Sequence, residues 1–492
     1  MDGGAPGQGR PAPAADGAPG PPEPLPAGGG APGQGRPAPA AVGAPGPPET
    51  VPAGGGDPGQ RGPAPVDDGA PGRGGPASAA DGASGPPGTA SAADRAPGPP
   101  GAVPAGGGAS GRDGPGGGGP GRWGTVNVAG RSGGGGGDAG LRGRLEAAWV
   151  GRAVGCVLGK PVEKLPLHGI RALARAAGNW PLDDWFTARR VPAELLAAYP
   201  WNRRSAPTSL AENIDGTPED DDLNYPLLNL LLLQRHGKRF TTADVGRLWL
   251  DELPAGRTFT AERAAYRNLL HGLEPPATAR HHNPFREWIG ALIRADVHGW
   301  TNPGDPAAAA AQAYRDATLT HTGNGVYAAL FVAAAIAEAA TGRADIHTAL
   351  RAGLAVVPPR SRLAEAVRFG IRAAEAENEA RFDRVVDRLH ERYGHYHWVH
   401  ALPNTALIAA ALTHADGDFT HSICRAVSGG WDTDSNGATA GSLAALVAGS
   451  PQDIPHRWTA PLKNRLATTV PGFDGIGFDT LAHLTAQEAA RP

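Results

Sequence analysis

The chain has 492 residues, which is long enough for two or three ordinary domains and a large buried core. Its formal net charge is −3, and the residues after position 140 carry 37 basic and 37 acidic side chains. This balance gives no electrostatic reason to expect a nucleic acid or an anionic membrane as the partner.

Signals for membrane insertion and export are absent from the sequence. No stretch reaches the roughly 18 consecutive apolar residues that a membrane-spanning helix needs, and the first 30 residues lack the basic and apolar regions of a signal peptide. The two cysteines, Cys156 and Cys424, are too few for a disulfide framework or a cysteine-based zinc site, and we interpret both as small buried apolar residues. We therefore expect a cytoplasmic protein.

The first 140 residues differ in composition from the rest of the chain. They hold 45 of the 74 glycines and 28 of the 50 prolines, and the motif GAPGQGRPAPA begins at Gly4 and again at Gly30. With almost no large apolar side chains, such a segment cannot bury enough surface to offset its ordering entropy. We predict a disordered Gly/Pro/Ala-rich repeat tail over 1–140, either a solvated extension or a tether, and one folded domain over 141–492.

The remaining residues have apolar positions at helical spacing and little strand-like alternation, so we expect an all-α domain. Within it, the mostly apolar run Ala328–Ala340 predicts a central buried helix. The clearest helical segments are Leu141–Leu158, Leu223–Arg235, Ala307–Ala340, Leu363–Glu377 and Asn404–His414.

Four consecutive carboxylates, Glu219–Asp222, stand directly before one of these helical segments. Thr217 as N-cap, Pro218 at the first helical position and Asp220 three residues after the cap fit a capping pattern, which accounts for one or two of them. The other carboxylates repel each other unless water or a cation neutralises them. Pro226 adds a second anomaly, because it would interrupt an ideal helix about two turns in.

A second polar cluster lies near the end of the chain. Asp432, Asp434 and Ser435 offer three oxygen ligands within four residues, and a run of small residues, 437–442, follows. An EF-hand loop that starts at Asp432 would need a bidentate Glu at its twelfth position, where the chain has Leu443, so this loop type is excluded. A turn that only caps a helix remains the structural alternative.

The two clusters contain oxygen donors and no histidine, which suits Mg²⁺, Ca²⁺ or Mn²⁺ rather than zinc. Two oxygen-rich helix starts can converge on one site and hold one or two such ions. Ions held in this way orient substrate hydroxyls and lower the pKa of bound water.

Three motifs carry a resemblance to a known family. They are Gly430–Ala445, with the Asp-x-Asp-Ser-Asn pattern and its small-residue helix; Gly151–Glu163, a Gly-rich helix that ends in Glu; and Thr320–Tyr327, which contains His321. Over residues 145–450 or so, the chain resembles the ADP-ribosylglycohydrolases.

The resemblance implies an all-α orthogonal multi-helix bundle with two divalent ions, Mg²⁺ foremost and Mn²⁺ or Ca²⁺ as alternatives. It implies hydrolysis of the glycosidic bond between ADP-ribose and an acceptor, with an ADP-ribosylated protein or small molecule as the substrate. Asp221 or Glu163 would act as the catalytic base, and His321 and Asn324 would line the substrate pocket. The implied metal ligands are Glu219, Asp220, Asp221, Asp432, Asp434 and Ser435.

The chain departs from the family pattern at several positions. Glu219 and Asp222 stand where the family has threonines, and Cys156 stands where it usually has Asp. These changes suggest a divergent branch and leave open a non-catalytic protein that binds ADP-ribose or a related nucleotide. An isoprenoid synthase is a weaker alternative, because Asp220–Asn224 is similar to its Asp-rich motif but the second motif of that class is missing.

Overall fold

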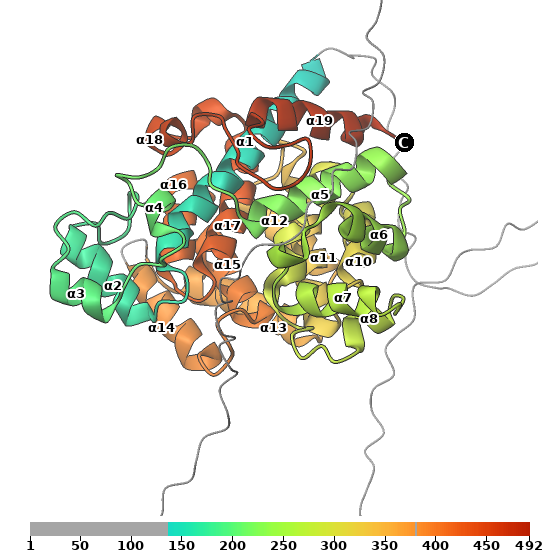
Figure 1. The fold of residues 1–492 in the computed structure, drawn as a ribbon. Coiled ribbons are helices and arrows are strands. Elements are labelled where there is room, and N and C mark those ends of the chain that lie inside the picture. Colours follow the sequence, from blue (N-terminus) through green and yellow to red (C-terminus); the bar gives the residue numbers. More distant parts are fainter. Residues whose placement is uncertain (1–135, 379–380) are drawn as a thin grey trace, which may run out of the picture. The chain divides into compact units, whose positions relative to one another are not determined.

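The computed structural model describes residues 136–378 and 381–492, and regular secondary structure in this part of the chain is entirely helical (Figure 1). Its only β pairing consists of isolated bridges such as Thr217 with Leu466. The predicted all-α class is therefore confirmed. The predicted tail lies outside the described residues up to position 135, and the first helix begins at Gly136, inside that predicted segment.

The helices follow one another through short loops. The first are α1 (Gly136–Gly159), α2 (Leu167–Ala177), α3 (Ala193–Ala198), α4 (Ala206–Ser209), α5 (Asp221–His236), α6 (Thr242–Glu252), α7 (Thr260–Leu270) and α8 (Ala277–Arg280). The next are α9 (Asp296–Trp300), α10 (Pro306–Ala317), α11 (Gly323–Ala339), α12 (Ile346–Ala355), α13 (Arg362–Glu375) and α14 (Phe382–Tyr393). The last are α15 (Ala401–His414), α16 (Phe419–Ser428), α17 (Thr433–Ala448), α18 (His456–Thr459) and α19 (Phe478–Ala490).

Short 3₁₀ helices connect several of these elements. They are η1 (Lys160–Val162), η2 (Ala255–Arg257), η3 (Ile289–Arg294), η5 (Pro451–Asp453) and η6 (Ala460–Leu462). No helix in the described part of the chain is both long enough and apolar enough to span a membrane.

The centre of the fold is formed by helices that are buried nearly all round. All residues of α15 are buried, and α17 is buried from Thr433 to Leu446. The predicted central helix is confirmed, since α11 buries almost every residue from Ala328 onward. The longer predicted segment Ala307–Ala340 is not continuous, because a loop separates α10 from α11 and Gly323 adopts the left-handed conformation at φ 51°.

Helices α1 and α17 cross with their backbones in contact, side by side near the middle of the ribbon (Figure 1). A Cβ atom at Gly155 would lie 1.9 Å from the carbonyl oxygen of Gly437, and one at Gly151 would lie 2.4 Å from that of Gly441. Glycine is thus required at these positions because the opposing atoms belong to backbone and cannot rotate away. The crossing brings the end of α1 against the start of α17.

Helix α5 begins later than the capping pattern predicts. Its N-cap is Asp220, whose carboxylate accepts the N–H of Asp222 at 2.9 Å. The prediction of Thr217 as N-cap is wrong, because the Thr217 N–H donates instead to the carbonyl of Arg465 at 2.8 Å and the residue pairs with Leu466. This long-range pairing outweighs the local capping preference.

The glycine crossing can be tested with two substitutions in one helix. We expect Gly155→Ala to lower the free energy of unfolding by about 1–3 kcal/mol, because the added methyl group forces α1 and α17 apart. Gly143→Ala is the matched control: its Cβ would lie 3.9 Å from the nearest atom, the carbonyl oxygen of Gly449. Urea unfolding should show no loss for the control, and equal effects of the two variants would contradict this packing.

Candidate metal centre

Three carboxylates from two separate segments meet where α1 crosses α17. Glu163 follows η1, and Asp432 and Asp434 stand at the start of α17. One oxygen from each lies within 4.8 Å of the others. Asp432 and Asp434 are 5% and 6% exposed, whereas Glu163 is half-buried. The structure therefore brings together the Glu and the two Asp residues that the sequence motifs indicate.

The start of α17 is held in place by contacts on both sides. The Thr433 hydroxyl donates to the carbonyl of Gly159 at 2.8 Å, which ties α17 to the end of α1. On the other side, the Asn404 side-chain oxygen accepts the N–H of Asp432 at 3.1 Å and the amide group of Asn436 at 2.7 Å. Because all these groups are buried, the positions of the two aspartates depend on the fold rather than on solvent.

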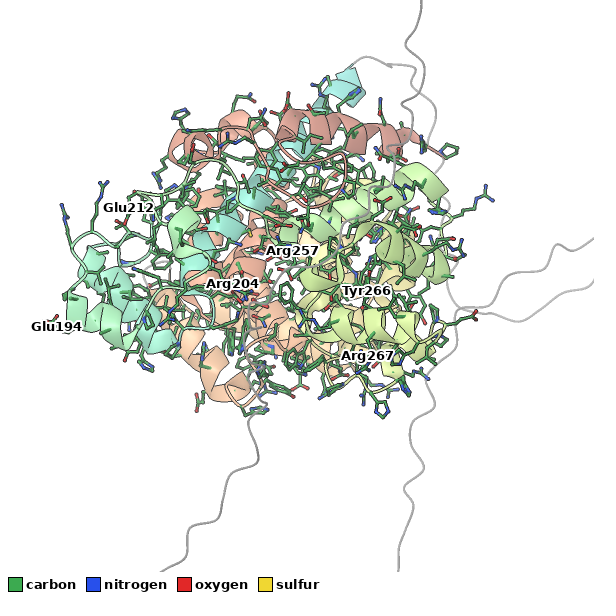
Figure 2. The ribbon with its side chains drawn as sticks, viewed as in Figure 1. Glu194, Arg204, Glu212, Arg257, Tyr266 and Arg267 are labelled. Carbon is green, nitrogen blue, oxygen red and sulfur yellow. The ribbon has the colours of Figure 1, made fainter. Side chains whose placement is uncertain are left out.

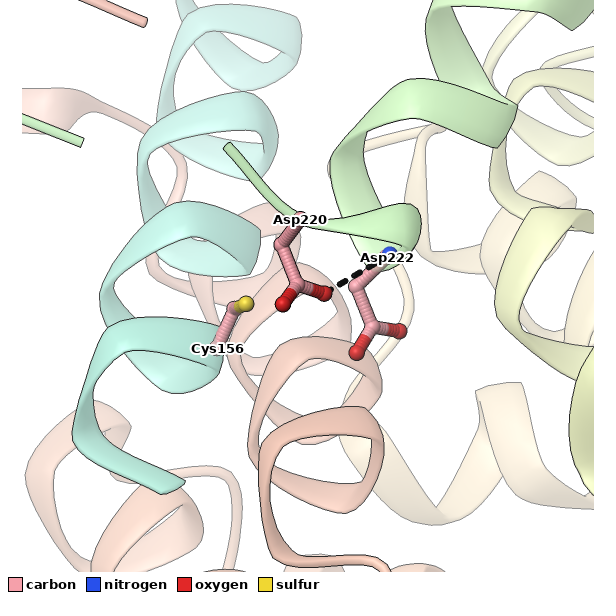
Figure 3. Close-up of side chains that lie close together, drawn as sticks. All are labelled: Cys156, Asp220 and Asp222. Carbon is pink, nitrogen blue, oxygen red and sulfur yellow. Dashed lines mark hydrogen bonds between the residues drawn. The ribbon is translucent and has the colours of Figure 1, made fainter. Parts of the chain in front are cut away.

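A second group of possible ligands lies next to the first. It comprises Cys156 from α1 and Asp220 and Asp222 from the start of α5, with ligand atoms again within 4.8 Å of one another (Figure 3). The hydroxyl of Ser435 donates to Asp222 Oδ2 at 3.2 Å, which links α17 to α5 and the two groups to each other.

Two buried cations occupy this second group. The Lys160 ammonium forms an ion pair with Asp220 Oδ2, and it also donates to the carbonyl of Glu219 at 3.3 Å. The Arg152 guanidinium pairs with Asp222 Oδ1 at 3.1 Å and with Asp296 Oδ2 at 3.1 Å. Removing one partner of such a fully buried pair costs about 3–5 kcal/mol, because the other charge remains uncompensated.

Pro226 explains how Arg152 reaches the backbone of α5. In an uninterrupted helix the carbonyl of Asp222 would accept the N–H of residue 226, but proline has none. Arg152 Nε donates to this carbonyl instead, at 2.7 Å. The proline that seems out of place in the sequence therefore frees a backbone acceptor for a buried arginine.

The first group is electrostatically unfavourable without a cation. Burial raises the pKa of Asp432 well above its usual range, and the neighbouring Asp434 and Glu163 carboxylates add to the effect. The pKa of Asp434 is raised in the same way by burial, Glu163 and Asp220. Like charges packed this closely in a poorly solvated site need either protons or a bound cation.

The second group is partly neutralised by its own cations. Burial raises the pKa of Asp222 to about 7 even though Arg152 opposes the shift. For Asp220, burial acts in the same direction, but the Lys160 ammonium outweighs it and the pKa falls below its usual value. Burial would lower the pKa of Lys160, yet Asp220 holds it above the usual value.

The donor sets of the two groups suit different occupants. Glu163, Asp432 and Asp434 offer carboxylate oxygens alone, and this set fits a hard divalent cation such as Mg²⁺ or Mn²⁺. In the second group Cys156 contributes sulfur, and burial raises the pKa of its thiol well above the usual range, with a further contribution from Asp220. A neutral thiol is a poor metal ligand.

Glu219 is placed outside both groups. Its carboxylate accepts hydrogen bonds from the Thr469 hydroxyl at 2.6 Å and from the Asn224 amide at 3.1 Å, and it forms an ion pair with Arg257 at 2.7 Å (Figure 2). Glu219 therefore connects the start of α5 to η2 and to the loop that precedes α19. Asp221, by contrast, is half-buried and makes no side-chain hydrogen bond or ion pair with the described residues.

The two predicted substrate-pocket residues lie apart from the carboxylates. His321 is fully buried, with Nδ1 at 2.6 Å from the Thr320 hydroxyl and 3.8 Å from Glu262. Asn324 lines a cavity of about 490 Å³ together with Tyr327, Arg362 and the Pro358–Ser361 loop. Neither carboxylate group lines this cavity. The roles of His321 and Asn324 in substrate binding stay predictions.

Three residues of this centre were not among those predicted from the sequence. Asp222 was treated as a replacement for a threonine, and Arg152 and Lys160 were not assigned any role. Pro226, four residues after Asp222, is the one sequence signal for the Arg152 contact, because it marks an unused carbonyl. Lys160 gives no such signal, since its partner Asp220 is 60 residues away.

Comparison with known proteins places this geometry in a family. The family description "ADP-ribosylglycohydrolase" matches residues 138–489, which covers most of the chain and includes every residue of the two carboxylate groups. The chain belongs to the ADP-ribosylglycohydrolase family.

One similar solved structure is titled "ADP-ribosylglycohydrolase-related protein complex". It is 21% identical to this chain, covers 71% of this chain and 98% of its own, and superposes with a TM-score of 0.44. The curated proteins contain no match.

Proton and metal binding should compete at the two groups. In the metal-free protein, Asp222 keeps its proton up to a pKa of about 7, whereas in the unfolded chain it ionises near 3.8. Such a group lowers stability as pH rises between these two values. We therefore expect Mn²⁺ to raise the melting temperature more at about pH 7.5 than at about pH 5. Thermal unfolding with Mn²⁺ or a chelator measures this, and a larger effect at the lower pH would contradict it.

A second pair of variants separates ligands from positioning residues. We expect Asp434→Asn to weaken Mn²⁺ binding at least tenfold or so, because it removes a ligand charge. Glu219→Ala should change the affinity by less than about threefold while lowering stability by about 1–3 kcal/mol, since it loses charged hydrogen bonds to the loop. Calorimetric titration with Mn²⁺ decides, and equal losses of affinity would show that Glu219 is a ligand.

Proposed function

We propose that the chain is a metal-dependent hydrolase that cleaves the glycosidic bond between ADP-ribose and an acceptor. The observation that carries the proposal is the buried group of Glu163, Asp432 and Asp434 in a member of this family. Three carboxylates whose mutual repulsion calls for a cation are costly to keep unless they bind one. An ADP-ribosylated protein or small molecule is the proposed substrate.

A divalent cation held by this group supplies positive charge that orients the ribose hydroxyls and polarises water. The residues around it have separate tasks. Glu163 is fixed by the Asn202 amide, at 2.8 Å from Oε2, and it is exposed enough to face a substrate. Asp221 has no partner among the described residues and is half-buried, so its carboxylate is free to accept a proton from water.

The surrounding carboxylates serve the same reaction. Glycoside hydrolysis develops positive charge at the anomeric carbon, and negative side chains nearby stabilise that charge. Asp432 and Asp434 are fixed before substrate arrives by the contacts of α17 with Gly159 and Asn404, so little reorganisation is needed. The acceptor leaves with a proton, and either Asp221 or Glu163 is suited to exchange it.

A specific observation supports a second candidate function. Lys160 and Arg152 bind two of the acids directly, which reduces the negative charge available for catalysis. A protein that binds ADP-ribose or a related nucleotide without cleaving it would tolerate these contacts. Binding that requires metal, without release of ADP-ribose, distinguishes this second function from hydrolysis.

Release of ADP-ribose tests the first proposal. We expect the full chain with Mg²⁺ or Mn²⁺ to release ADP-ribose from at least one of a panel of substrates linked through arginine, serine, a nucleic-acid end or a small molecule. The double variant Asp432→Asn/Asp434→Asn should lower the rate at least 100-fold or so, because it removes two ligands of the ion.

Glu194→Gln provides the matched control, since it removes one exposed carboxylate from α3, far from the centre in Figure 2. Its rate should equal that of the wild type. Release that persists in the double variant, or that does not depend on added metal, would contradict the proposed mechanism. Metal-dependent binding of ADP-ribose without any release would favour the binding protein.

A further inference from the structure

We propose that Lys160 is a built-in cation: its ammonium group takes the place of a second divalent ion, so that the chain binds a single ion between Glu163, Asp432 and Asp434. This inference rests on the proposed function, which supplies that metal site. It departs from the pair of ions that the family resemblance implies, and it assigns a role to a residue that the reaction does not otherwise use.

Lys160 is placed where a cation is needed. It belongs to η1, directly after α1, and its side chain is 9% exposed, as is that of its partner Asp220. Its ammonium contacts Asp220 Oδ2 and the carbonyl of Glu219, which are two oxygens of the segment that carries the carboxylate run. A buried ammonium surrounded by oxygens satisfies the same charge requirement as a metal ion there.

The oxygens of the second group are already in use. Asp220 accepts the N–H of Asp222 with Oδ1 and the ammonium of Lys160 with Oδ2. Asp222 accepts Arg152 with Oδ1 and the Ser435 hydroxyl with Oδ2. A divalent ion at this position would displace these partners or stand beside two buried positive charges. The remaining donor, Cys156, offers sulfur, whereas Mg²⁺ and Mn²⁺ prefer oxygen.

The first group differs in the cation that it holds. Glu163 pairs with Lys164 at 2.8 Å, but the Lys164 side chain is 58% exposed and can release the carboxylate to water at little cost. Lys160 has no comparable way out, because it is enclosed at the end of α1. The structure therefore leaves one group open to an external ion and closes the other with an internal one.

The number of bound ions tests the inference. We would titrate the metal-free full chain with Mn²⁺ by calorimetry and record its electron paramagnetic resonance spectrum. The expected result for the wild type is one ion per chain with the spectrum of an isolated Mn²⁺. Lys160→Met should bind a second ion and show coupling between two ions, which lie about 3.5–4 Å apart in two-metal sites.

Three further variants keep the test decisive. Lys160→Arg retains the charge and should stay at one ion, and so should Lys463→Ala, which removes an exposed lysine paired with Asp215. Asp220→Asn should also keep the single ion, because Asp220 is not its ligand, and this arm remains informative if Lys160→Met does not fold.

Each remaining outcome overturns the inference. Two ions in the wild type, one ion in a folded Lys160→Met variant, or loss of the single ion in Asp220→Asn would show that Lys160 does not replace a metal. No bound ion in the wild type would instead contradict the proposed function, so the two failures are distinguishable.

Discussion

The crossing of α1 and α17 is the constraint on which the rest of the structure depends. Backbone contact at Gly155 and Gly437 leaves no room for side chains, so the two helices can approach only in this one register. Glu163 and the Asp432–Asp434 pair are brought together because they stand at the same end of that crossing. The Thr433 hydroxyl fixes the distance between the helices at the ligand end by bonding to the carbonyl of Gly159. Close packing and the position of the carboxylates are therefore one property of the fold.

Burying so many acids requires compensation, and the protein uses two kinds. Arg152 and Lys160 neutralise Asp222 and Asp220 from within, through contacts made possible by Pro226 and by the turn after α1. The carboxylates around Asp434 have no equivalent internal cation that is buried, and their raised pKa values reflect this deficit. The uneven distribution of internal cations determines which part of the centre attracts an external one.

The helical class and the buried α11 could be predicted from apolar spacing, because those features depend on local periodicity. The three-carboxylate group could be predicted through motif resemblance, which supplies the long-range convergence that spacing alone does not. The N-cap of α5 and the placement of Glu219 could not, since they depend on Leu466 and Thr469, more than 200 residues further along the chain. The contact between Arg152 and Asp222, 70 residues apart, is equally invisible to local patterns.

The most direct test of this account is a crystal structure of the full chain grown with Mn²⁺, with the ions located by anomalous scattering. The account predicts one peak bounded by Glu163, Asp432 and Asp434, with Lys160 still in contact with Asp220. A peak between Asp220 and Asp222 with Lys160 displaced would show that the internal cations yield to metal, and no peak beside Asp432 and Asp434 would remove the basis for metal-dependent chemistry.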